Sequence, residues 1–370
     1  MRSVLISGAS IAGPALAYWL RRHGFSVTVV ERSPDLRPGG QPIDIRGAAL
    51  EVVARMGLKA QIEARRTHLG GANVLDRNGN EIERHTDRTL SAGRHDSGDV
   101  EIIRDDLSAL LYEATQNGVD YRFNDTIVAM EEGVDKVSVA FERSPTSDFD
   151  LVMGADGIYS NVRRQTFGPS EPFLKYLGAY VAIFTVENFL GLKDWQTAIG
   201  NEGGGMLVLP ARENTELRVF MMFESEPLGR DLTSVQQKAL LTERFKDFRW
   251  EAPRLLAFLQ QTTELYFGEV AQVRMPRWSR GRVALIGDAG YCPSPRSGQG
   301  TSLALVGAYV LAAELAQHGN NYATALVRYE QRMRPFVELN QALALRGPGE
   351  RVSDQELDHA KNAITLPAAI

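Results

Sequence analysis

The sequence predicts an α/β protein in which a first domain of alternating strands and helices is interrupted by a second domain rich in β-strands. Three observations support this fold class. The chain begins with a strand, turn, helix and strand over residues 4–31. Its middle, residues 176–223, changes to the apolar and polar alternation of antiparallel strands. A buried strand and a long apolar helix then return after residue 282, so the α/β pattern resumes.

The N-terminal unit has the features of a site for the ADP half of a dinucleotide. An apolar run is followed by the turn Gly8-Ala9-Ser10-Ile11-Ala12-Gly13, an amphipathic segment and a second strand that ends on Glu31. Gly8 allows the tight turn, and Gly13 lets the helix pack against the strand. The helix N-terminus offers N–H groups to a pyrophosphate, and Glu31 can accept hydrogen bonds from ribose hydroxyls. Ser10 replaces the usual middle glycine, and the alternative is an ordinary parallel α/β unit.

Periodicity and turn signals predict the elements that follow. The pair Asn78-Gly79 predicts a β-hairpin over residues 70–83, and Asp105 or Asp106 is expected to cap a helix after residue 103. An apolar strand over 151–153 ends at Gly154-Ala155-Asp156-Gly157. Further strands are expected at 120–130, 136–142, 179–186, 205–209, 217–223 and 266–273, and helices at 48–56, 234–245 and 253–261. The polar tail beyond Gly347 is expected to be loosely attached.

The last α/β segment carries a second group of polar residues at the end of a strand. The strand over 282–286 is followed by Gly287-Asp288-Ala289, and a loop then delivers Gly298-Gln299-Gly300 into a long apolar helix. A Gly-x-Gly loop at a helix N-terminus offers backbone donors to an electron-rich group. Asp288, at the carboxyl end of a strand, can accept hydrogen bonds from a polyol chain. The alternative is a simple connection with glycine hinges.

Composition excludes several other classes of protein. The 370 residues suggest two connected domains, and 44% hydrophobic with 24% charged residues is ordinary for a globular protein. A net charge of −5 argues against nucleic acid as a partner. The single cysteine, Cys292, fits a reducing cytoplasm, and six scattered histidines predict no metal site. The absence of a signal peptide and of an 18-residue apolar run predicts neither export nor a membrane span.

Taken together and in this order, the motifs resemble those of the class A flavoprotein monooxygenases. This is the para-hydroxybenzoate hydroxylase-like family, which includes aromatic hydroxylases and tetracycline-inactivating oxygenases. The likeness rests on residues 8–13 with Glu31, on 154–157 with Ser160 and Arg163, and on 287–289 with Pro295 and 298–300. It covers most of residues 1–345. It implies a Rossmann-like FAD-binding domain of the GR2 type (1–70, 98–170 and 270–345), a β-rich substrate-binding domain (71–97 and 171–269), and a C-terminal helix with a tail (346–370).

The resemblance also implies roles for single residues around a non-covalently bound FAD. Glu31 would bind the adenosine ribose, Asp288 the ribityl chain, and Arg104 the ribityl and phosphate side. Asp156 would serve the pyrophosphate region, and residues 298–300 would place N–H groups at the flavin pyrimidine edge, where reduction puts negative charge. The full expected set is Gly8, Ser10, Ile11, Ala12, Gly13, Glu31, Arg32, Arg46, Arg104, Asp156, Asp288, Pro295, Gly298, Gln299, Gly300 and Thr301. Arg46, Arg218 and Pro295 are the candidates for contact with substrate or flavin. Tyr291 stands where many members of the family have histidine.

The function that the resemblance implies is an FAD-dependent monooxygenase. NAD(P)H would dock transiently, because no second glycine fingerprint is present, and O2 would react to give a flavin hydroperoxide that hydroxylates an aromatic or polycyclic substrate. Met206, Val208, Arg218, Phe220 and Met222 alternate and are candidates to line one face of a sheet above the flavin, while the favoured interpretation of any single one is that it belongs to the core. A flavin halogenase is disfavoured by the lack of a Trp-x-Trp-x-Ile-Pro segment. A flavin-dependent reductase and a non-catalytic FAD-binding protein stay open, as does the choice between monomer and homodimer.

Overall fold

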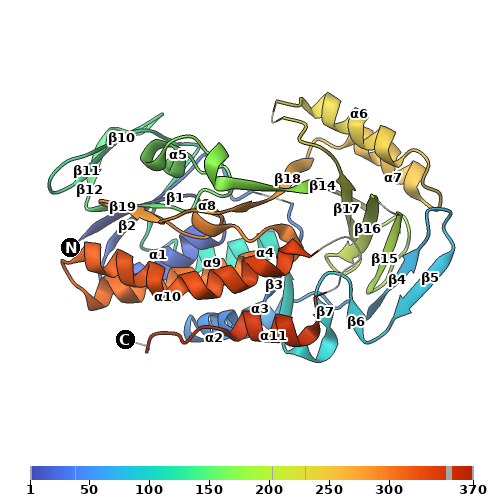
Figure 1. Ribbon diagram of the computed structural model, residues 1–370, viewed down its shortest axis with the longest axis horizontal. Coiled ribbons are helices and arrows are strands. Elements are labelled where there is room, and N and C mark those ends of the chain that lie inside the picture. The colour runs from blue at the N-terminus through green and yellow to red at the C-terminus, as the bar shows by residue number, and fades with distance from the viewer. Residues whose placement is uncertain (1, 38, 202, 230, 347–351, 369–370) are drawn as a thin grey trace.

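Two large sheets lie at opposite ends of the molecule (Figure 1). The computed structural model describes residues 2–37, 39–201, 203–229, 231–346 and 352–368. The six-stranded sheet has the spatial order β19 (Ser279–Arg280), β20 (Val283–Leu285), β13 (Leu151–Gly154), β1 (Ser3–Ser7), β2 (Ser26–Glu31) and β9 (Asp120–Phe123). All its neighbours are parallel except β19 and β20. Because Ser7 pairs with Val30 and with Gly154, and Gly154 with Leu285, the predicted motifs follow strand ends at one edge of this sheet.

The helix Ala12–Arg22 packs on one face of this sheet, and the helix Asn161–Phe167 lies with the three-stranded sheet of residues 127–149 on the other (Figure 1). Because both faces are covered, the central strands are continuously apolar. Val4, Leu5 and Ile6 of β1 are fully buried. The helices of this part are α1 (Ala12–Arg22), α4 (Arg104–Glu113), α5 (Asn161–Phe167), α9 (Gly300–Gln317) and α10 (Tyr322–Ala342), with α9 and α10 side by side (Figure 1). Among the described helices, α9 alone is long and apolar enough to cross a membrane. However, 78% of it is buried, as in the core helix of a globular protein.

The seven-stranded sheet forms the other end of the molecule. Its order is β18 (Tyr266–Val273), β14 (Leu174–Glu187), β17 (Glu216–Glu224), β16 (Gly204–Ala211), β15 (Trp195–Asn201), β4 (Gly71–Leu75) and β5 (Glu81–His85). The hairpin expected around Asn78-Gly79 is confirmed as β4 and β5, and it joins this sheet through a parallel pairing of β4 with β15. Strand β15 was not predicted. Helices α6 (Ser234–Phe245) and α7 (Ala252–Gln261) pack on one face (Figure 1). The residue boundaries of the two domains stay a prediction.

The remaining elements connect and flank the two sheets. A two-stranded sheet of β3 (Pro42–Ile45) and β8 (Val100–Ile103) carries the segment that follows the first βαβ unit. The others are α2 (Ala48–Arg55), α3 (Lys59–Ala64), β6 (Arg88–Thr89), β7 (Gly93–Arg94), the three-stranded sheet of β10 (Ile127–Glu132), β11 (Val137–Phe141) and β12 (Ser147–Phe149), α8 (Asp288–Tyr291) and α11 (Asp354–Asn362). Short 3₁₀ turns lie at His95–Ser97, Glu171–Phe173, Pro295–Ser297 and Leu343–Leu345.

The expectation that five residues of the middle strands share one face is wrong. Val208 pairs with Val219 and Met206 with Met221, and all four are buried against α6 and α7. Phe220 and Met222 alternate with these residues along β17, so their side chains lie on the opposite face. The alternation within each strand was correct, but the register between β16 and β17 differs from the assumed one.

The predicted cap of α4 is also wrong. This helix begins at Arg104, directly after the extended Ile103, and no side chain of the described residues caps its first turn. Asp105 and Asp106 lie inside that turn instead, and each pairs with Arg212 at 2.8 Å. Acidic groups in a first turn are favourable near the positive end of the helix dipole. The two carboxylates therefore connect α4 to the hairpin between β16 and β17.

The C-terminal segment is packed against the protein, contrary to the expectation of a loose tail. Residues 347–351 and 369–370 lie outside the described residues. Lys361 of α11 is 4% exposed and donates to the Asp99 carboxylate at 3.1 and 3.2 Å. The Asn340 amide donates to the carbonyl of Ala360 at 2.9 Å, and Tyr309 donates to that of Pro367 at 2.9 Å. The sequence analysis missed this packing because the contacts described are hydrogen bonds and a buried ion pair, which a polar sequence does not reveal.

Candidate active site

The glycine turn after β1 is built by close backbone approach. Gly8 has a φ of +108°, and a Cβ atom on it would lie 2.5 Å from the carbonyl oxygen of Ala155. A Cβ atom on Gly13 would lie 1.9 Å from the carbonyl oxygen of Gly8. Real Cβ atoms do not approach an oxygen this closely, so both positions need glycine. Ser10 is exposed on the turn, so its side chain displaces no part of the protein.

Glu31 is held beside this turn by backbone donors. The N–H of Ala9 donates to its Oε2 at 2.8 Å, and the N–H of Ser33 donates to its Oε1 at 3.0 Å. Each carboxylate oxygen keeps a further lone pair with which it can accept a ligand hydroxyl. Arg32, the next residue, is exposed. The carboxylate is thus oriented at the end of β2, as the ribose role requires.

Asp156 uses its carboxylate inside the chain. It accepts hydrogen bonds from the Ser160 hydroxyl and from the N–H groups of Asn161 at 2.8 Å and Val162 at 3.1 Å, so it anchors the start of α5. Desolvation raises the pKa of this carboxyl above its ordinary value. The structure therefore gives Asp156 a clear role in shaping the loop that abuts Gly8. Its role at a pyrophosphate stays a prediction.

The motif of residues 287–289 and 298–300 lies against the glycine turn of residues 8–13 beside α9. A Cβ atom on Gly287 would lie 3.0 Å from the Cβ of Ala12, and one on Gly300 would lie 3.8 Å from the Asp288 carboxylate. Asp288 is exposed to solvent, yet desolvation by the surrounding protein raises the pKa of its carboxyl. The Asp288 carboxylate is therefore open to solvent although protein surrounds much of it. A ligand with hydroxyl groups can reach it there.

The loop before α9 holds polar atoms whose hydrogen-bonding capacity is unmet. Gln299 is fully buried, and neither amide atom has a partner among the described residues. Arg46 is 5% exposed and donates to Asp44 at 2.8 Å, but its Nε is buried and lacks a partner in the described chain. A Cβ atom on Gly298 would lie 3.6 Å from the Arg46 guanidinium. A buried unsatisfied group costs about 1–3 kcal/mol. A flavin, whose ring edge carries donors and acceptors, fits these requirements.

The first turn of α9 supplies further donors to the same place. The helix begins at Gly300 with Thr301 behind it, and the first N–H groups of a helix have no partner within it. Pro295 is exposed in the loop that precedes this turn. Residues 298–301, Arg46 and Asp288 are therefore close together in space, as the sequence predicted.

Arg104 and Tyr291 both make contacts within the protein, and the role of Arg104 at the cofactor stays a prediction. Arg104 is 9% exposed and donates to the carbonyl oxygens of Arg37 at 2.9 Å and Gly39 at 3.0 Å, so it holds the loop before β3. The Tyr291 hydroxyl lies 2.9 Å from that of Tyr329, deep in the core. The Tyr291 hydroxyl therefore points into the core, whereas Asp288 is exposed.

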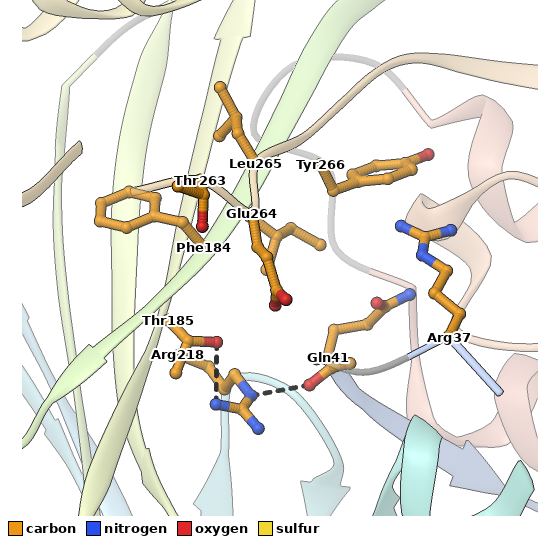
Figure 2. Close-up of a pocket in the computed structure, with 12 residues that line it drawn as sticks. Arg37, Gln41, Phe184, Thr185, Arg218, Thr263, Glu264, Leu265 and Tyr266 are labelled. Atoms are coloured by element: carbon orange, nitrogen blue, oxygen red, sulfur yellow. Dashed lines mark hydrogen bonds between the residues drawn. The ribbon is translucent and has the colours of Figure 1, made fainter. Parts of the chain in front are cut away.

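A cavity of about 260 Å³ opens between the loop before β3 and the seven-stranded sheet (Figure 2). Its lining comes from residues 37 and 39–41, from β14 and β17, and from residues 263–266, whose Glu264 side chain reaches into the space. Arg218 lines it but is 2% exposed, and it donates to Gly40 O at 2.8 Å and to Thr185 Oγ1 at 2.9 Å. Glu216 pairs with the same guanidinium at 2.8 Å. Each of the three guanidinium nitrogens of Arg218 thus has a partner in the protein.

A partly exposed apolar surface lies on the face of the sheet away from α6 and α7. It consists of the half-buried Ile183, Leu207, Phe220 and Met222. Beside it, Gln196 of β15 accepts a hydrogen bond from the N–H of Leu90 at 2.8 Å and donates to the Ser91 hydroxyl. The carbonyl of Ser91 lies 3.4 Å from Arg46. Ile183, Leu207 and Gln196 were missed by the sequence analysis, although the alternation along each strand was a usable signal.

Comparisons with known proteins identify the family of this chain. A family model described as FAD binding domain matches residues 1–343. An uncharacterized protein of Mycobacterium tuberculosis is 48% identical over 369 residues, which cover 99% of each chain. A flavin-dependent monooxygenase of Legionella longbeachae is 40% identical over 342 residues, or 91% of this chain and 86% of that one. The crystal structure of tetracycline destructase Tet(51) matches with a TM-score of 0.87 at 34% identity, over 100% of both chains.

Proposed function

The chain belongs to the FAD-binding-domain family of flavin-dependent monooxygenases, and from this premise we propose that it uses NAD(P)H and O2 to hydroxylate an aromatic or polycyclic small molecule. The substrate carries a phenolic or enolic ring. The single observation that supports this most strongly is the group of unsatisfied buried polar atoms of Gln299 and Arg46 beside the N-terminus of α9. They lie close to the Asp288 carboxylate, where a flavin ring and its ribityl chain can meet them.

The residues around this place have separable tasks. Bound FAD supplies the chemistry that activates oxygen. Glu31 orients the adenosine ribose, and Asp288 orients the ribityl hydroxyls. The N–H groups at the start of α9 and the Arg46 guanidinium stabilise negative charge on the ring edge, because preorganised donors in a site with little water are effective there. Each of these groups is already held by strand ends or by hydrogen bonds, so little reorganisation is needed.

The substrate class is supported by the apolar surface of Ile183, Leu207, Phe220 and Met222. A planar ring packed on this surface would exclude water from the reacting atoms. An electron-rich ring is the partner that an electrophilic oxygen donor requires. The relation to a tetracycline destructase at 34% identity supports a polycyclic substrate with enolic oxygens. NAD(P)H docks transiently in this proposal, because the sequence has a single dinucleotide turn.

The test is a panel of phenols, naphthoquinols and tetracyclines given to the purified flavoprotein. Loss of NAD(P)H, uptake of oxygen and product mass are followed together. A substrate should accelerate NAD(P)H oxidation and gain one oxygen atom, labelled from heavy oxygen gas and unlabelled from heavy water. A product that forms at a comparable rate without oxygen from the gas would contradict this proposal and identify a flavin-dependent reductase.

A further inference from the structure

Two carboxylates face each other behind the Arg46 loop. Asp44 on β3 and Glu101 on β8 are directly paired residues of an antiparallel ladder. They are 7% and 5% exposed. Side chains at such positions have Cβ atoms about 4.5–5.5 Å apart, and like charges directly opposite destabilise the pair of strands. Two ionised carboxylates at this place would repel each other with little screening by water.

Each carboxylate has one oxygen with a partner and one without. Arg46 donates to Asp44 Oδ2 at 2.8 Å, and the Thr67 hydroxyl donates to Glu101 Oε1 at 2.6 Å. Asp44 Oδ1 and Glu101 Oε2 are buried, and neither has a hydrogen-bond partner among the residues that the structure describes. The Ser91 hydroxyl favours the ionised form of Glu101 and so opposes the rise of its pKa. One proton held between the two oxygens would satisfy both.

The surrounding charges leave one carboxylate without a cation. Arg46 pairs with Asp44, and the buried Lys361 of α11 pairs with Asp99 at 3.1 Å. Asp358, on the same helix, also contacts Lys361 at 2.8 Å but is exposed. Within the described residues, the groups that favour the ionised form of Glu101 are the hydroxyls of Thr67 and Ser91 and the shared Arg46. If Asp44, Asp99 and Glu101 were all ionised, the three negative charges would exceed the two positive ones, and burial makes this excess costly.

The pKa shifts of Glu101 and Asp44 agree with this geometry. Desolvation, followed by the charge of Asp44, raises the pKa of Glu101 to about 7. Desolvation likewise raises the pKa of Asp44, although Arg46 opposes the change. Because the two groups interact strongly, their titration belongs to the pair rather than to either residue.

We propose that Asp44 and Glu101 share one proton and form a singly charged acid pair that positions Arg46 and responds through it to charge on the flavin. The proton sharing is a property of this chain alone, whereas the response to the flavin rests on the proposed function. When reduction places a negative charge near Arg46, the pair should take up a second proton from solvent. It then becomes neutral, and Arg46 is left to face the flavin charge. Asp44 and Glu101 are thus positioning residues, since they act through Arg46.

The first experiment detects the shared proton without any use of flavin. Infrared spectra of the protein near neutral pH should show the C=O stretch of a protonated carboxyl that shifts in heavy water. This band should be lost in Glu101→Gln and kept in Glu131→Gln, an exposed control on β10. Absence of the band in the wild type, or its persistence in Glu101→Gln, would overturn the proposal.

A second measurement does not depend on whether the variant folds. Carbon-13 NMR of the wild-type side-chain carboxyls should show one Glu and one Asp carbon that titrate together, well above the exposed carboxyls. If every Asp and Glu carbon titrated in the ordinary acidic range, the pair would not exist.

The closing experiment tests the connection to the flavin. The reduction potential of the bound FAD is measured against pH in the wild type, in Glu101→Gln and in Glu131→Gln. The wild type and Glu131→Gln should show one additional proton taken up per two electrons near neutral pH, and Glu101→Gln should not. Equal pH dependence in all three proteins would overturn the response to the flavin. A protein that shows the carboxyl band but binds no FAD would instead contradict the proposed function.

Discussion

The cofactor edge of the six-stranded sheet and the apolar face of the seven-stranded sheet build the site in different ways. At the edge, backbone contacts dominate: Gly8, Gly13 and Gly287 permit close approach, and N–H groups orient Glu31. At the face, side chains from separate strands are brought together only by strand register. The edge therefore tolerates almost no added atom, whereas the face can change its side chains without loss of its backbone. The edge can therefore keep one cofactor while the side chains of the face change to suit a different substrate.

The edge should be the least tolerant part of the protein. In Gly13→Ala the added Cβ atom meets the backbone oxygen of Gly8, so we expect the free energy of unfolding to fall by roughly 3 kcal/mol or more, with loss of FAD binding. Denaturant unfolding of the apoprotein measures this. Gly24→Ala is the control, because it also lies next to α1 but has open space around it. Its positive φ should cost only about 1 kcal/mol. Equal losses in the two variants would contradict the close-approach argument.

Between the two regions, the acid pair should make stability depend on pH. The pKa of Glu101 in the folded state, about 7, lies above its ordinary value of 4.5. The folded state therefore holds the proton more tightly, so the contribution of this group to stability is complete below pH 4.5 and is lost as pH rises through 7. We expect this loss to be roughly 2–3 kcal/mol and to be absent in Glu101→Gln. Urea unfolding at several pH values measures it. A parallel pH dependence in the two proteins would count against the shared proton.

The electrostatic part of the edge is tested by Glu31→Lys. This change removes the acceptor of the Ala9 and Ser33 N–H groups and of the ribose, at about 1.5–3 kcal/mol for bonds to a charged group. FAD affinity in a fluorescence titration should drop tenfold or more. Asp35→Lys, the same change of charge at an exposed neighbour, should have little effect. Similar losses in both would mean that net charge, rather than the position of Glu31, governs binding.

The face should show the smallest and most selective effect. Phe220→Ala removes part of the apolar surface and should raise the KM for an active substrate about tenfold, while FAD affinity stays unchanged. Val219→Ala is the matched control on the same strand, because Val219 is fully buried on the side of α6 and α7. It should lower stability without a change in KM. If Val219→Ala raised KM and Phe220→Ala did not, the assignment of the two faces would be reversed.

Much of the fold could be predicted because local patterns decided it. The helix over residues 234–245 and the strand over 266–273 have the predicted bounds, since amphipathic period and alternation are properties of consecutive residues. Strand β15 was missed because its sequence, with small and polar residues, lacks a clear alternation. The C-terminal segment was misjudged because Lys361 and Asn340 attach it through long-range polar contacts. Amino-acid composition does not predict such long-range contacts.

The glycine turn, Glu31 and Asp288 could be identified from the sequence, because each follows a strand and parallel strands bring their carboxyl ends to one edge. The sequence could not show which residues of β16 and β17 share a face, or that Asp44 stands opposite Glu101. In a strand with a two-residue period, a register shift of one residue moves every side chain to the other face. Register depends on partners far away in the chain, so no local pattern specifies it.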